Sequence, residues 1–158
     1  MNLNIRKYNL NLKMKLRKAI YEDLPSIYNL VVELAIFEKE PDAVKATLQD
    51  YQEHHKNGLI DIIVAEDEGA IIGMALYYDT FSTWRGKMLY LEDFVVNHAY
   101  RGKGVGSLIY DEFIEEAKRR KCTMVKWQVL DWNDGAVRFY EQKGATIEKG
   151  WWNVKVIF

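Results

Sequence analysis

Two acidic residues interrupt an apolar stretch near the middle of the chain, in the sequence Tyr90-Leu91-Glu92-Asp93-Phe94-Val95-Val96. A carboxylate in a strand can take a proton from an alkylammonium group, whose deprotonation at pH 7 costs about 4.6 kcal/mol when its pKa is near that of lysine. Successive residues of a strand face opposite sides of a sheet, so we expect only one acid to face a cleft. We predict that Glu92 is this base, acting directly or through a water molecule. The alternative is that both are ordinary strand carboxylates held by hydrogen bonds.

A glycine-rich segment, Arg101-Gly102-Lys103-Gly104-Val105-Gly106, follows these acids. Glycine allows positive φ angles and a close approach of the backbone to a ligand. A helix that begins at Gly104 presents unpaired N–H groups and the positive end of its dipole to an anion. Arg101 and Lys103 add positive charge. The segment predicts a phosphate or pyrophosphate site, although a tight turn or an anion site without chemistry has the same pattern.

The spacing of these glycines distinguishes between classes of phosphate loop. Lys103 stands between glycines, which excludes the loop of nucleoside triphosphatases. The dinucleotide fingerprint needs one more residue before its third glycine and an acidic residue at the end of the next strand, and residues 127–130 contain no acid before Asp131. The remaining pattern is Arg/Gln-x-x-Gly-x-Gly/Ala, matched by Arg101, Gly104 and Gly106. This segment resembles the pyrophosphate loop of the GNAT superfamily of N-acetyltransferases.

The elements that must position these residues follow from hydrophobic periodicity and turn residues. The predicted order is a strand at 14–19, helices at 24–36 and 47–55, strands at 60–66, 70–78 and 88–96, a helix at 104–120, a strand at 124–130, a helix from Asn133 to Gly144, and a strand at 151–158. Trp84 lies at the tip of a turn over 80–87. The order resembles the GNAT fold, an α/β fold whose mixed, mostly antiparallel sheet of six to seven strands is flanked by about four helices.

Further segments resemble the diamine N-acetyltransferase family, which includes the spermidine/spermine and thialysine enzymes. The similarity covers about residues 16–151, and the matching segments are Glu33-Leu34-Ala35 leading to Glu38, Tyr77-Tyr78, Trp84-Arg85-Gly86-Lys87, Tyr90 to Phe94, Tyr100-Arg101-Gly102, Trp132-Asn133, Phe139-Tyr140 and Lys143-Gly144-Ala145. The chain departs from that family at Phe37, where a tyrosine is usual, and at Ser82-Thr83, which replaces a more acidic turn containing proline.

The resemblance implies transfer of the acetyl group of acetyl-CoA to a primary amine of a small (poly)amine or lysine-like substrate, directly, in a ternary complex. It implies a catalytic role for Glu92 and Tyr140, the latter at the departing sulfur. It also implies that the amine site includes Phe37, Glu38, Trp84, Glu92 and Asp93. The implied cofactor-binding residues are Phe94, Val95 and Val96 along the pantetheine arm, Arg101, Gly102, Lys103, Gly104, Val105, Gly106 and Ser107 at the pyrophosphate, and Asn133, Asp134, Gly135, Ala136 and Tyr140 along the CoA groove.

Two chemical expectations accompany this assignment. A backbone N–H near Phe94 to Val96 can stabilise the oxyanion that forms when an amine attacks a thioester. A phenol gives its proton to a thiolate uphill, by about 2 kcal/mol, so we expect Tyr140 to share its proton while the thiolate leaves. The alternative for Tyr140 is a core tyrosine bonded to a carbonyl.

Length, charge and composition limit the remaining possibilities. The 158 residues suit a single acetyltransferase domain over 14–158, after an Asn- and Lys-rich segment at 1–13 that we expect to be a flexible extension. The net charge of −1 gives no basic footprint for nucleic acid, and no apolar run is long enough for a membrane span. A single cysteine suggests a reducing, cytoplasmic location. We expect no metal, and a homodimer. Two alternative functions are acetylation of a protein lysine or N-terminus, and a non-catalytic CoA-binding regulatory module.

Overall fold

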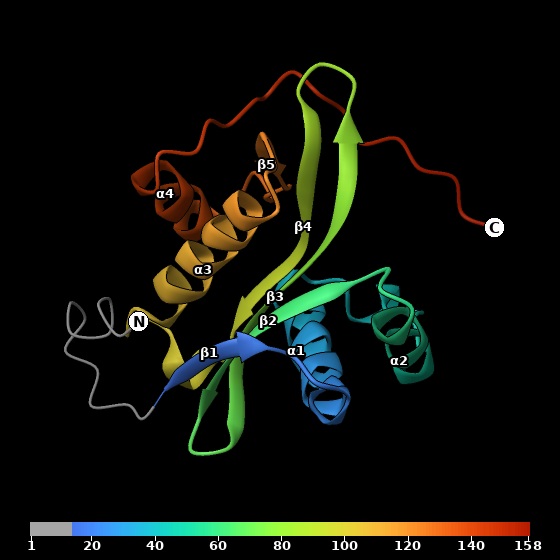
Figure 1. Cartoon of the computed structure of the whole chain (residues 1–158), viewed down its shortest axis with the longest axis vertical. Helices are drawn as coiled ribbons and strands as arrows, with labels where there is room; N and C mark the ends of the chain where they lie inside the picture. Colours follow the sequence, from blue (N-terminus) through green and yellow to red (C-terminus); the bar gives the residue numbers. More distant parts are fainter. Residues whose placement is uncertain (1–13) are drawn as a thin grey trace. The chain divides into compact units, whose positions relative to one another are not determined.

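The computed structural model describes residues 14–158, so the extension predicted at 1–13 lies outside the described residues (Figure 1). The chain divides between Trp127 and Gln128 into two compact units. The first unit contains the sheet and three helices, and the second contains one helix and the C-terminal segment. The prediction of a single domain over 14–158 stays a prediction.

A five-stranded sheet forms the centre of the first unit, with the strand order β1-β2-β3-β4-β5. Its strands are β1 (Lys15–Lys18), β2 (Asp61–Asp67), β3 (Ala70–Ser82), β4 (Gly86–Val96) and β5 (Met124–Lys126). The first four strands are antiparallel neighbours and β5 runs parallel to β4. The β2–β3 turn has positive φ angles at Glu68 and Gly69, as a tight two-residue hairpin turn requires.

Helices cover both faces of this sheet (Figure 1). Side chains alternate along each strand, so one face of the sheet packs on α1 (Leu24–Phe37) and α2 (Leu48–Lys56), and the other packs on α3 (Val105–Arg119). Ile62, Val64 and Leu76 belong to the α1 face, whereas Ile63, Ala65 and Tyr77 belong to the α3 face. Three short 3₁₀ turns complete the unit, at Tyr21–Asp23, Pro41–Ala43 and His98–Tyr100.

The helix ends follow local sequence signals. At α2, the Thr47 hydroxyl accepts a hydrogen bond from the Asp50 amide while the Asp50 carboxylate accepts one from the Thr47 amide, which is a reciprocal capping box. At the end of α1, Lys39 adopts a φ of +64° and the Glu40 amide donates to the Ala35 carbonyl at 2.9 Å. This arrangement is a Schellman stop, in which glycine is the usual left-handed residue.

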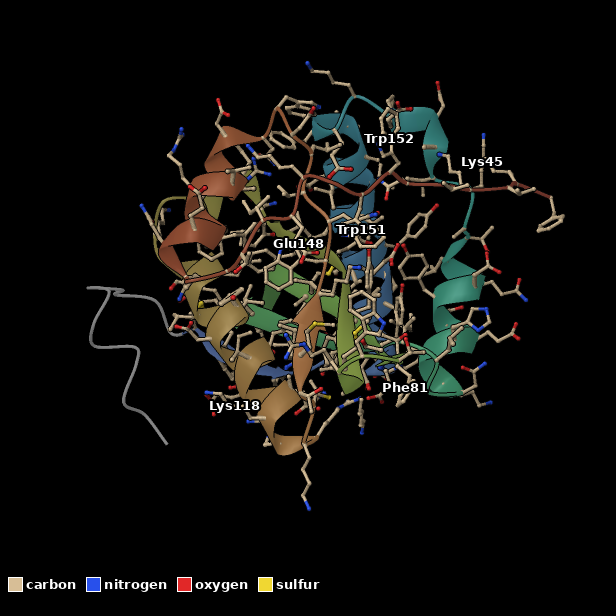
Figure 2. All side chains as sticks on the ribbon, turned by 90° about the horizontal axis from the view of Figure 1, so that it is seen from above. Lys45, Phe81, Lys118, Glu148, Trp151 and Trp152 are labelled. Carbon is tan, nitrogen blue, oxygen red and sulfur yellow. The ribbon has the colours of Figure 1, made fainter. Side chains whose placement is uncertain are left out.

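The second unit contains α4 (Asp134–Gln142), whose first turn is capped by the Asn133 side chain, and a C-terminal segment without helix or strand. The strand predicted at 151–158 is therefore wrong, and the one predicted at 124–130 ends at Lys126. The sheet consequently has five strands, not six to seven. Trp151 and Trp152 on this segment are 75% and 92% exposed (Figure 2). Apolar and β-branched residues favour a strand only where a neighbouring strand pairs with them.

Candidate functional site

An irregularity in β4 determines where the two acids point. Leu76 on β3 pairs with Asp93 and Tyr77 pairs with Leu91, so Glu92 is an extra residue without a partner, in a β-bulge. Leu91 and Tyr77 pack in the α3 core, and Leu76, opposite Asp93, packs in the α1 core. Asp93 therefore faces α1 and α2.

Glu92 faces the same side of the sheet. Its carboxylate accepts a hydrogen bond of 2.8 Å from the hydroxyl of Tyr78, and Tyr78 alternates with Tyr77 on β3. The expectation that Glu92 and Asp93 lie on opposite faces is wrong, because the bulge interrupts the alternation on which it rests. The two carboxylates form a pair on the α1 face.

Burial raises the pKa of Asp93 to about 6, and the negative charges of Glu92 and Glu38 contribute to this rise. Burial also raises the pKa of Glu38, which follows the last residue of α1. A carboxyl group whose pKa lies near neutral can hold and release a proton at physiological pH. The chemistry available here is therefore proton transfer to and from a group that enters this face.

A tyrosine of α2, Tyr51, also lies near the acids, with Tyr28 of α1 beside it. The rings of Tyr28 on α1 and Tyr51 on α2 meet edge to face, with 5.5 Å between their centroids. Burial raises the pKa of Tyr51 to about 12, and the charges of Asp93 and Glu92 add to this effect. These tyrosines were not predicted from the sequence as site residues. The spacing of Leu48 and Tyr51, three residues apart on a predicted helix, indicates that both side chains share one face, and both pack on the α1 core.

Phe94 and Val96 follow the acids on β4, beyond the segment of β4 that pairs with β5. β5 pairs with β4 only from Met88 to Tyr90. The amide of Asn97 donates to the Ile72 carbonyl at 2.8 Å, so Asn97 and Ile72 form a hydrogen-bonded pair of the antiparallel ladder. Hydrogen-bonded and non-hydrogen-bonded pairs alternate, so Val96 with Gly73, and Phe94 with Ala75, are non-hydrogen-bonded pairs. The N–H and C=O groups of Phe94 and Val96 therefore point away from β3, as an extended ligand pairing along β4 requires.

The glycine-rich loop has the geometry predicted for an anion site. Gly102 and Gly104 have φ angles of +73° and +82°, and α3 begins directly after Gly104 without a side-chain cap. A Cβ added to Gly102 would meet no atom within 4 Å, so the backbone is open at that point. Lys103 is nearby, with its ammonium group 5.2 Å from the ring centroid of Tyr100. This backbone and charge fit a pyrophosphate group. Val105, Gly106 and Ser107 form the first turn of α3.

Arg101 connects this loop to the acidic side of the sheet. Its Nε donates to the Val96 carbonyl at 3.0 Å, and its guanidinium carbon lies 5.2 Å from the centroid of the Phe37 ring. The Asn97 side chain also donates to the carboxylate of Glu33 on α1, at 3.5 Å. The structure thus brings together Phe37, predicted at the amine, and Arg101, predicted at the cofactor.

Trp84, predicted at the amine site, lies at the tip of the β3–β4 hairpin and is 87% exposed. Phe81 on the same hairpin is 70% exposed (Figure 2). From Gly86 to Glu92, β4 extends about 20 Å at the usual rise per residue, so the structure does not bring Trp84 together with Glu92.

The remaining candidates are in the second unit. The Asn133 side chain accepts a hydrogen bond from the Ala136 amide at 3.2 Å, and Asp134 and Gly135 form the first turn of α4. Tyr140 is buried and its ring contacts that of Phe139 edge to face, with 5.4 Å between centroids. The catalytic role of Tyr140 and the cofactor role of this turn stay predictions.

The sequence profile of the acetyltransferase (GNAT) family matches residues 19–145. The match covers most of the chain, so this protein belongs to the acetyltransferase (GNAT) family. Thialysine N-epsilon-acetyltransferase of Bos taurus is 35% identical over 149 residues, which cover 86% of this chain and 88% of that protein. Spermidine/spermine N(1)-acetyltransferase-like protein 1 of Homo sapiens is 34% identical over 149 residues; the match covers 87% of this chain and 21% of that longer protein.

A solved structure confirms the fold. An aminoglycoside acetyltransferase from an uncultured soil metagenomic sample superposes with a TM-score of 0.77 at 17% identity, covering 92% of this chain and 96% of that one. The family match and the named relatives confirm the predicted class of enzyme, an acetyl-CoA-dependent N-acetyltransferase, and the predicted likeness to the diamine branch.

Membrane spans and metal centres are two other classes of feature to consider in residues 14–158. Within that range no helix combines the length and apolar character needed to cross a membrane. No group of three or more His, Cys, Asp or Glu side chains in the same range is placed to hold a metal ion.

Proposed function

We propose that this protein transfers the acetyl group of acetyl-CoA to a primary amine of a small (poly)amine or lysine-like molecule, directly, in a ternary complex. The observation that carries the proposal is the pair of carboxylates at the β4 bulge, Glu92 and Asp93, directly before Phe94 and Val96, whose backbone groups point away from β3. The names of the relatives, a thialysine and a spermidine/spermine-like acetyltransferase, support a small amine as the acceptor.

In this proposal the carboxylate pair receives the substrate as an ammonium ion. Glu92 takes a proton from nitrogen, directly or through a water molecule, so that an N–H bond breaks and an O–H bond forms. The buried neighbour Asp93, with its pKa of about 6, is able to hold that proton in turn. The freed lone pair attacks the thioester carbonyl carbon.

The remaining steps concern the cofactor. The N–H groups of Phe94 and Val96 point away from β3, where a donor can stabilise the oxyanion. The C–S bond then breaks, the nitrogen loses its remaining extra proton to water, and Tyr140 shares its proton with the departing thiolate. The amides and cationic side chains from Arg101 to Ser107 hold the pyrophosphate, Val95 completes the pantetheine edge, and the turn from Asn133 to Ala136 lines the CoA groove. Phe37 and Glu38 keep their predicted place at the amine site as part of the proposal, whereas Trp84, which the structure does not bring together with Glu92, is left out of it.

The test is thiol release from acetyl-CoA with a panel of amines that includes spermidine, thialysine, a lysine-containing peptide and an amine-free blank. Turnover with a small amine is expected, and Glu92→Gln should lower the rate by about 10²- to 10⁴-fold. Glu115→Gln is the matched control, since it makes the same chemical change at an exposed residue of α3, paired with Lys118.

Two results would contradict the proposal. Turnover with the lysine-containing peptide alone would indicate a protein acetyltransferase. Binding of acetyl-CoA without turnover of any amine, and without an effect of Glu92→Gln or Tyr140→Phe, would indicate a non-catalytic module. The homodimer and the cytoplasmic location stay predictions, to be measured by light scattering and by imaging of the tagged chain.

A further inference from the structure

Tyr78 is the hydroxyl partner of Glu92. Its phenol oxygen donates to Oε2 of Glu92 at 2.8 Å, across the boundary between β3 and β4. Tyr78 lies opposite Tyr90 in the strand register, and the two rings stack with centroids 5.5 Å apart and an angle of 23° between their planes. The stacking fixes the direction of the Tyr78 ring, so the position of its hydroxyl is determined by the sheet.

The hydrogen bond from Tyr78 matters because the strand itself does not fix the side chain of Glu92. The bulge leaves it without an opposite residue on β3, and its side chain is exposed. An exposed glutamate on an unpaired strand position samples several rotamers, and ordering it has an entropic cost. A hydrogen bond from a phenol to a carboxylate is among the stronger ones in proteins and selects one rotamer.

We propose that Tyr78 is a positioning residue, whose hydroxyl holds the Glu92 carboxylate in one rotamer directed at the incoming amine. This inference rests on the proposed function, in which Glu92 receives the substrate. It concerns a residue outside the amine site as predicted from the sequence.

The groups that face Glu92 come from three elements. Tyr90 and Asp93 are its neighbours on β4, Tyr78 comes from β3, and Tyr51 comes from α2. Burial and the Glu92 charge raise the pKa of Tyr78 well above its ordinary value, so the phenol keeps its proton and remains a donor at any working pH.

Tyr78→Phe and Tyr90→Phe form a matched pair of variants. Each removes one hydroxyl from one ring of the same stack, but the hydrogen bond to Glu92 comes from Tyr78. The measurement is kcat and KM for the amine. Tyr78→Phe should lower kcat several-fold with KM nearly unchanged, because the carboxylate loses the donor that selects its rotamer. Tyr90→Phe should leave kcat in place.

A second measurement keeps the inference separate from the proposed function. The side-chain rotamer of Glu92 is followed by NMR through its Hα–Hβ couplings in the full chain, with Glu92→Gln for assignment. The couplings should show one dominant rotamer in the unsubstituted chain and in Tyr90→Phe, and averaging over several rotamers in Tyr78→Phe, whether or not any amine is acetylated. Equal kcat values and equal couplings in the two variants would overturn the positioning role. Averaged couplings in Tyr78→Phe without turnover would instead count against the proposed function alone.

Discussion

Replacement of Asp93 by asparagine should make the protein more stable and less active. Asp93 has an ordinary pKa of 3.8, which burial and the charges of Glu92 and Glu38 raise to about 6 in the folded chain. Between these two values the folded state holds a proton that the unfolded state has released, so stability falls as pH rises through this window. Above pH 6 both states are ionised and the full penalty remains.

The size of the penalty follows from the two values. Each pKa unit corresponds to about 1.4 kcal/mol, so the interval from 3.8 to about 6 amounts to about 3 kcal/mol in the free energy of unfolding. Asparagine has no charge to desolvate. Asp93→Asn should therefore gain up to about 3 kcal/mol at pH 8, about half of that at pH 5, and almost none at pH 3. The same variant should lose acetyl transfer, because it removes one acid of the pair.

Urea unfolding at pH 3, 5 and 8 gives the free energy of unfolding of both proteins, and the difference isolates Asp93 from other groups that titrate. Asp23→Asn is a contrasting variant, because the hydrogen bond from Arg17 at 2.6 Å lowers the pKa of Asp23. It should destabilise the protein at pH 8, and the loss should disappear as pH falls below 3.8. A gain for Asp93→Asn that is equal at pH 5 and pH 8 would refute the electrostatic reasoning, since a packing effect does not depend on pH.

Three further predictions concern the backbone and the loop. Lys39→Gly should stabilise the chain by about 1 kcal/mol in urea unfolding, because Lys39 has a φ of +64° at the end of α1. Gly104→Ala should weaken acetyl-CoA binding in calorimetry and destabilise the fold by about 1–2 kcal/mol, whereas Gly58→Ala, with a φ of +78°, should only destabilise it. Arg101→Gln and Phe37→Leu should not be additive in amine KM, with a coupling of about 0.5–1 kcal/mol, because their side chains are in contact; additive effects would show that the contact has no role.

Features that depend on neighbouring residues of the chain were predictable from the sequence. Thr47 and Asp50 stand three residues apart before a helical pattern, and the structure has the capping box there. The glycines of the loop predicted positive φ angles before α3, which Gly102 and Gly104 adopt. Such signals are local, because a few residues satisfy one another's backbone groups.

The expectations that proved wrong concern features that depend on residues distant in the sequence. The bulge at Glu92 has no composition signature, since its extra residue is an ordinary acid in an apolar run and its existence depends on the register with β3. The face of each acid therefore could not be read from alternation. The segment over 151–158 has strand-forming residues, yet a strand also requires a partner edge, which sequence pattern does not supply.

The end of α1 joins the two sides of the candidate site. Phe37 lies beneath the guanidinium group of Arg101, which also holds the Val96 carbonyl, while the next residue, Glu38, adds its charge to the field at Asp93. The left-handed turn at Lys39 fixes the direction in which the chain leaves these two residues. A movement of this helix end therefore changes the cofactor edge and the acid pair together. An enzyme that needs both substrates bound before transfer gains from such a coupling, because the arrival of one reduces the ordering left for the other.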